Sequence, residues 1–132
     1  MTALAAYLTQ AVRHRWQPGV HDCCTYPGDW VSSWGMGDPL AEWRGTYCSD
    51  AQAVRLINRA GGLLALWERG LASIGLFEVR DLRPGDVGVV LAATEMGQEP
   101  VGALFGGDRW SFRTEAGLIF APAVAIKAWG RR

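Results

Sequence analysis

Side chains able to take part in covalent chemistry lie next to one another at residues 21–24, where the chain reads His21-Asp22-Cys23-Cys24. A thiol at the start of a helix has its thiolate stabilised by the positive end of the helix and by unpaired backbone N–H groups. The same N–H groups are able to form an oxyanion hole. A cysteine hydrolase also needs an imidazole within hydrogen-bond reach, oriented by a third polar group. We therefore treat Cys23 as the candidate nucleophile and His21 as the candidate base.

Three interpretations of this segment are open. In the first, Asp22 caps a helix and the thiols are small buried hydrophobic side chains. In the second, Cys23 attacks a carbonyl carbon and His21 transfers the proton. In the third, Cys23, Cys24, Cys48 and His21 bind a metal ion, although adjacent cysteines lack the usual ligand spacing. We expect no metal and no cofactor.

The elements that must position this segment begin with helices, because the first half of the chain has apolar residues at helical spacing. Four helices are expected, over residues 4–12, from near 22–25 to 34, over 49–57, and over 63–69. Ser49 and Gln52 have the spacing of a capping box, and Pro27 fits the first turn of the second helix. Gly70 is expected to end the fourth helix.

After Gly75 the helical spacing gives way to β-branched residues and alternation. Arg83-Pro84-Gly85-Asp86 has the composition of a turn, and strands are expected over 87–91, 98–104, 109–112, 117–120 and 124–129. Helices followed by strands indicate an α+β fold, with the N-terminal helices packed on one face of a mostly antiparallel C-terminal sheet. We expect residues 1–132 to form a single domain.

Three short motifs in this order resemble the NlpC-type, papain-like cysteine peptidases that cut peptidoglycan stem peptides. Asp22-Cys23 matches the Asp-Cys of that family, Pro84-Gly85-Asp86 matches its turn, and Val101-Gly102 matches the strand that carries its general base. The resemblance implies a papain-like fold with Cys23 in the position of the nucleophile. The residue before Val-Gly is the catalytic histidine in active members, and here it is Pro100, which cannot transfer a proton.

The closest resemblance is to a small subgroup encoded among phage tail genes and in gene transfer agents. It rests on Trp30-Val31, on Asp38-Pro39 after a glycine, and on Arg44-Gly45-Thr46-Tyr47. The resemblance implies a tail or tail-tip protein of a phage or phage-like particle, made in the host cytoplasm and located in the virion tail, with other tail proteins as partners. With Pro100 in the position of the base, we expect a mainly structural role. The alternative is an active cell-wall peptidase that uses Cys23 and His21 on host peptidoglycan while the genome enters the cell.

Composition sets the class of partner. The 132 residues include 13 basic and 13 acidic side chains, so the formal net charge is zero and we expect no nucleic-acid partner. No segment reads as a membrane span or a secretion signal, and three cysteines do not form a disulfide framework. Seven residues are tryptophan, several of them in glycine-rich stretches. Most are expected in the core, and some are expected on the surface for contact with proteins or carbohydrate.

Overall fold

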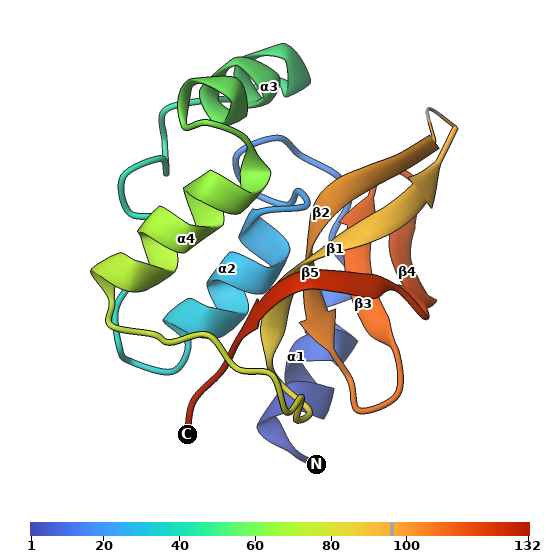
Figure 1. Ribbon diagram of the computed structural model, residues 1–132. Helices are drawn as coiled ribbons and strands as arrows, with labels where there is room; N and C mark the ends of the chain where they lie inside the picture. Colours follow the sequence, from blue (N-terminus) through green and yellow to red (C-terminus); the bar gives the residue numbers. More distant parts are fainter. Residues whose placement is uncertain (96) are drawn as a thin grey trace.

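The computed structural model describes residues 1–95 and 97–132 and consists of four helices followed by a five-stranded antiparallel sheet (Figure 1). The helices are α1 (Ala3–Ala11), α2 (Thr25–Ser32), α3 (Asp50–Arg59) and α4 (Leu63–Ser73). The strands are β1 (Val87–Thr94), β2 (Gly97–Phe105), β3 (Trp110–Thr114), β4 (Gly117–Ala121) and β5 (Val124–Trp129). The expected α+β class, with helices first and an antiparallel sheet after them, is confirmed.

The sheet is curled. This follows from its strand order, β4-β3-β2-β1-β5, together with the short link between β4 and β5. β4 and β5 are therefore the two edges, yet β4 ends at Ala121 and β5 begins at Val124. Three residues reach at most about 10 Å, whereas the outer strands of a flat five-stranded sheet lie about 19 Å apart. The two edges must approach each other at this end, so the sheet bends into an open barrel.

Two hydrophobic clusters lie on the two faces of the curled sheet. Val87 and Val89 of β1 pack with Trp67 of α4 and with other residues of the helices, and Figure 1 shows α2 and α4 against this face. Val90 and Ala92, which alternate with them, belong to the second cluster. That cluster fills the inside of the curl, and its members are Val90, Ala92, Ala103, Trp110, Phe112 and Ala128.

The fourth helix extends beyond its expected end. α4 continues through Gly70 to Ser73. A Cβ at Gly70 would lie 2.2 Å from the carbonyl oxygen of Pro39, so this glycine allows a loop to approach the helix instead of ending it. Gly75, with a φ of 76°, follows the helix. The expectation that α4 ends at Gly70 is therefore wrong, and the reason is a contact with a loop distant in sequence.

The tryptophans are buried to a greater extent than expected. Five of the seven are buried and belong to the two clusters, namely Trp30, Trp43, Trp67, Trp110 and Trp129. Trp16 and Trp34 are half-buried. The expectation that most lie in the core is confirmed, and the expectation that some are exposed is wrong. Exposed aromatic surface comes instead from phenylalanine, above all Phe77, which is 80% exposed.

Candidate functional site

Asp22 organises the turn that leads into α2. Its Oδ1 accepts hydrogen bonds from the backbone N–H groups of Cys24 at 2.9 Å and Thr25 at 2.8 Å, and its own N–H donates to Thr25 Oγ1. Its Oδ2 accepts from the N–H of Gly19 at 2.8 Å and from the hydroxyl of Tyr47 at 2.5 Å. Asp22 thus caps this turn, and the N–H groups of Cys24 and Thr25 are already occupied. They are not available to form the oxyanion hole that the sequence suggested.

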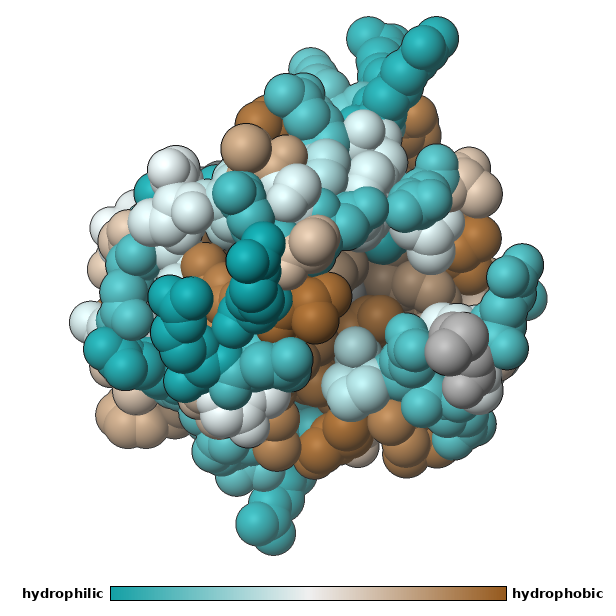
Figure 2. Space-filling view, turned by 90° about the horizontal axis from the view of Figure 1, so that it is seen from above, coloured by the Kyte–Doolittle hydropathy of each residue, from teal (hydrophilic) through white to brown (hydrophobic). Residues whose placement is uncertain are grey.

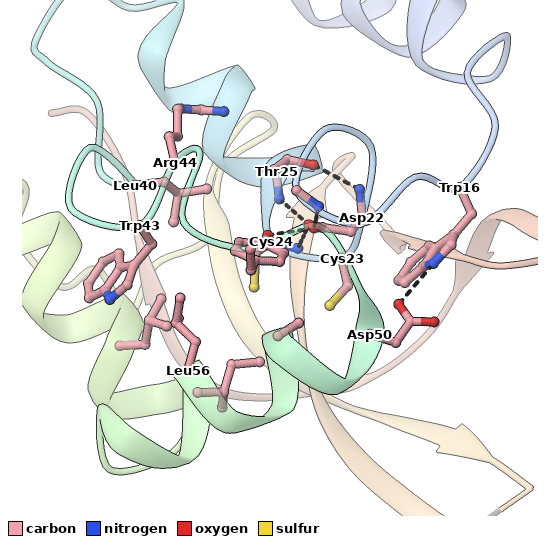
Figure 3. Close-up of a pocket in the computed structure, with 15 residues that line it drawn as sticks. Trp16, Asp22, Cys23, Cys24, Thr25, Leu40, Trp43, Arg44, Asp50 and Leu56 are labelled. Atoms are coloured by element: carbon pink, nitrogen blue, oxygen red, sulfur yellow. Dashed lines mark hydrogen bonds between the residues drawn. The ribbon is translucent and has the colours of Figure 1, made fainter.

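The two thiols differ in environment. Cys24 is 7% exposed and belongs to the core beneath the helices. A hydrogen bond with Cys23 and burial raise the pKa of the Cys24 thiol well above its ordinary value. Cys24 therefore stays protonated and acts as a small hydrophobic side chain. Cys23 is only half-buried, and Figure 3 shows its sulfur pointing into a pocket.

The pocket beside Cys23 is small and apolar, with a volume of about 50 Å³. Leu40, Leu56 and Leu66 contribute to its walls. Trp16 closes one side by donating its indole N–H to Asp50 Oδ1 at 3.2 Å. Neither His14 nor His21 lines this pocket. Figure 2 views the molecule from the end at which α3 lies, and a hollow in this face has apolar side chains at its centre and hydrophilic residues around it.

His21 lies in a different pocket, of about 60 Å³, which it shares with residues of α1 and β3. Its ring stacks on that of His14, with 4.0 Å between centroids and 8° between planes. His14 itself is exposed, as expected. The structure therefore places Cys23 and His21 in separate pockets, although only Asp22 separates them in sequence. The role of His21 as a base stays a prediction.

Three effects depress the pKa of His21 below its ordinary value of 6.5. Burial is the largest, followed by the positive charges of His14 and Arg113.

Replacing His14 with glutamine removes one of these charges, so we expect the pKa of His21 to rise, whereas Arg13→Gln leaves it unchanged. The titration of the ring protons by NMR measures both values. The folded-state pKa of His21 lies below that of the unfolded chain, so the unfolded chain takes up the proton first as the pH falls through 6.5. The free energy of unfolding therefore decreases over this range. A lower pKa of His21 in His14→Gln contradicts this account.

β2 passes directly beside the Cys23 turn. A Cβ on Gly102 would lie 2.8 Å from the carbonyl oxygen of Cys23 and 3.2 Å from Nε1 of Trp67, so only glycine allows the strand to come this close. Pro100 lies two residues earlier, where side chains point to the same face of the strand. It is exposed and pairs with Leu91 of β1. The position that resembles that of a catalytic histidine is thus on the face of β2 toward Cys23, and a proline occupies it.

The polar residues of β3 have structural partners. The hydroxyls of Ser111 and Tyr26 form a hydrogen bond of 2.6 Å. Arg113 is 3% exposed and donates to the carbonyl oxygens of His14 at 2.9 Å and Ala11 at 3.0 Å. The guanidinium of Arg113 also lies over the ring of Tyr26, 5.5 Å from its centroid. Both β3 side chains therefore hold α1 and α2 to the sheet.

The motif residues of the 38–47 loop also have structural partners. Arg44 pairs with Asp38 at 2.5 Å and with Asp29 of α2 at 2.6 Å. Tyr47 donates to Asp22, and burial together with this hydrogen bond raises the pKa of the Tyr47 hydroxyl. These contacts join residues that no local sequence rule places together. The Arg-Gly-x-Tyr pattern was the available signal, and its arginine and tyrosine fasten the loop to α2 and to the Asp22 turn.

Within residues 1–95 and 97–132, no three His, Cys, Asp or Glu side chains gather closely enough to hold a metal ion. Over the same residues, every helix is too short or too polar to cross a membrane.

Comparison with known proteins assigns the chain to a family. No curated protein and no solved structure matches it. Residues 1–130 match the family model described as "Domain of unknown function (DUF6950)", which spans nearly the whole chain, and the protein therefore belongs to the DUF6950 family.

Proposed function

We propose that the chain is a tail or tail-tip protein of a phage or phage-like particle, with an NlpC-type papain-like fold that serves contacts with other tail proteins. One observation carries the mainly structural role. The pocket of Cys23 contains no imidazole, because Pro100 stands on the β2 face toward Cys23 and His21 lies in another pocket. Without a base, a thiol in an apolar pocket has no partner to hold its thiolate or to protonate a leaving amine.

Exposed apolar side chains support the contact role. Ile119 and Phe120 of β4 are 39% and 47% exposed, and Val124 and Ile126 of β5 are 69% and 43% exposed. These two strands are the edges of the sheet and approach each other at the 121–124 link. Exposed edges with apolar side chains favour association with other proteins, which fits a component of a tail assembly.

A second candidate, the cell-wall peptidase, is favoured by the position of Cys23. The thiol points into a pocket at the start of α2, and β2 passes against its backbone, in the same order as the motifs of the NlpC-type peptidases. In that case the substrate is a peptide bond of host peptidoglycan. The two candidates differ in one property, which is whether Cys23 cleaves.

A cleavage assay with isolated peptidoglycan separates the two candidates. We expect no release of soluble fragments by the wild type above the level of Cys23→Ala. Pro100→His is the matched gain-of-function variant, because it puts an imidazole on the β2 face toward Cys23. Release by the wild type that is lost in Cys23→Ala overturns the structural role and establishes the peptidase. Mass spectrometry of purified particles is expected to find the chain together with tail proteins, and its absence from them overturns the tail assignment.

A further inference from the structure

A second, larger hollow lies on the far side of the 40–47 loop from the Asp22 turn, between α3, α4 and this loop. Its volume is about 600 Å³, and three of its lining residues are arginines, Arg55 and Arg59 of α3 and Arg69 of α4. We call it the arginine groove. Among the described residues that line it, Glu42 is the one that is acidic. In a chain with equal numbers of acidic and basic residues, this groove is a local concentration of positive charge.

The charge of the groove is not neutralised within the described chain. Arg69 pairs with Glu42 at 2.7 Å. Arg55 is exposed and donates its Nε to the carbonyl of Ala51 at 3.4 Å, and its terminal nitrogens form no hydrogen bond with residues 1–95 or 97–132. Arg59 makes no ion pair or side-chain hydrogen bond with any residue of 1–95 or 97–132. Two guanidinium groups are therefore open to an external anion.

The spacing between these arginines is unfavourable for the helix, although Arg59 lies in the last turn, where its charge suits the negative end of the helix. Arg55 and Arg59 are four residues apart, and like charges at this spacing destabilise a helix by a few tenths of a kcal/mol. Neither has an acidic residue three or four positions away along α3. Packing of α3 is only partial, since none of its residues is fully buried and Leu56 and Ile57 contact the core from half-buried positions. A ligand with negative charge would relieve the repulsion and hold the exposed helix in place.

The shape and lining of the groove indicate the class of anion. A guanidinium group binds a carboxylate through two parallel hydrogen bonds. Trp43, Leu56 and Ala60 line the groove beside the arginines and offer apolar contact to the aliphatic part of a side chain. The volume lies in the range of sites that bind drug-sized ligands, so the groove takes up a part of a longer segment. A nucleic acid would need a longer basic track than this single groove in a neutral chain.

We propose that the arginine groove binds a glutamate- and aspartate-rich segment of a partner protein. This proposal rests on the tail-protein function insofar as the partner is another tail protein. The groove supplies paired guanidinium groups for the carboxylates and an apolar floor for the side-chain methylenes. Thr46 and Gln52, also in the lining, add neutral hydrogen-bonding groups.

The test is fluorescence anisotropy of a labelled Glu-rich octapeptide, with a Lys-rich octapeptide of the same length for comparison. We expect the wild type to bind only the acidic peptide, and Arg55→Gln/Arg59→Gln to bind it roughly tenfold more weakly or worse. The matched control is Arg80→Gln/Arg109→Gln, which removes two exposed arginines outside the groove and is expected to retain wild-type affinity. Circular dichroism checks folding, and the single variant Arg59→Gln serves if the double variant unfolds.

Three outcomes overturn the proposal. They are absence of binding to the acidic peptide, equal loss of affinity in the groove and control variants, and preferential binding of a single-stranded oligonucleotide at the same arginines. Each of these three outcomes can be told apart from a failure of the proposed tail-protein function. The peptidoglycan assay tests Cys23, and mass spectrometry of particles tests the tail assignment, so neither measurement depends on the groove.

Discussion

Asp22→Ala is expected to lower the free energy of unfolding by about 3–5 kcal/mol. Asp22 is 4% exposed, and its carboxylate accepts four hydrogen bonds, three from backbone N–H groups and one from Tyr47. Hydrogen bonds to a charged group are each worth more than neutral ones. Alanine leaves these donors buried without an acceptor, and it releases both the start of α2 and the 40–47 loop. Urea unfolding followed by circular dichroism measures the loss.

Two matched variants show how much of this loss of stability comes from each group of hydrogen bonds to Asp22. Tyr47→Phe removes one donor and is expected to cost about 1–2 kcal/mol. Asp22→Asn keeps one carbonyl oxygen but turns an NH₂ group toward donors, so its cost is expected to lie between those of Tyr47→Phe and Asp22→Ala. A loss below about 1 kcal/mol for Asp22→Ala would show that the turn does not depend on the carboxylate. Equal losses for all three variants would mean that only the contact with Tyr47 matters.

The same residue shows which parts of the site are predictable from sequence. That Asp22 caps a helix follows from local pattern, since aspartate accepts bonds from N–H groups two and three residues ahead. Its hydrogen bond with Tyr47 joins residues 25 positions apart, and no local rule places a loop on that turn. Once Asp22 is buried between α2 and the loop, the residues on its two sides diverge. Cys23 then faces one pocket and His21 the other.

The helices and strands were predictable where their bounds depend on residues that are close together in the sequence. The cap of α3 is an example, because Ser49 accepts from the N–H of Gln52 at 3.1 Å as their spacing predicts. The side chain of Gln52 departs from the capping box and accepts from the N–H of Cys48 instead. The five strands lie where alternation and turn residues place them.

The curl of the sheet and the course of α4 were not predictable from local pattern. The curl follows from the order of the strands, which depends on pairings between segments distant in sequence. Gly88 shows the consequence, because a Cβ there would lie 2.9 Å from the ring of Trp110 on the inside of the curl. Likewise, Gly70 lies within α4, where the absence of a side chain leaves room for the carbonyl group of Pro39. In both cases a glycine that resembles a breaker provides room for a distant neighbour.

Arg113→Met is expected to lower the free energy of unfolding by about 2–3 kcal/mol. Within residues 1–95 and 97–132, this buried guanidinium forms no ion pair with a carboxylate. Its partners are instead the carbonyl oxygens of Ala11 and His14 at the negative end of α1, and the ring of Tyr26. Methionine avoids the cost of burying a charge but leaves the carbonyl of His14 without a donor. We expect the second effect to be larger, because Ala11 is the one buried residue of α1 and the other core contacts of this helix come from half-buried side chains such as Tyr7.

A general loss of packing and a loss of the α1 anchor make different predictions for Arg113. If Arg113 anchors α1, the amides of α1 exchange with deuterium faster in Arg113→Met while those of α4 are unchanged. The pKa of His21 also rises, because the positive charge of Arg113 contributes to its depression. Arg113→Lys keeps that charge, so it is expected to leave His21 nearly unchanged. Lysine reaches one carbonyl where the guanidinium bridges two, so Arg113→Lys still costs about 1 kcal/mol. Uniformly faster exchange, with His21 unaffected in Arg113→Met, would assign Arg113 to the core and not to the α1 anchor.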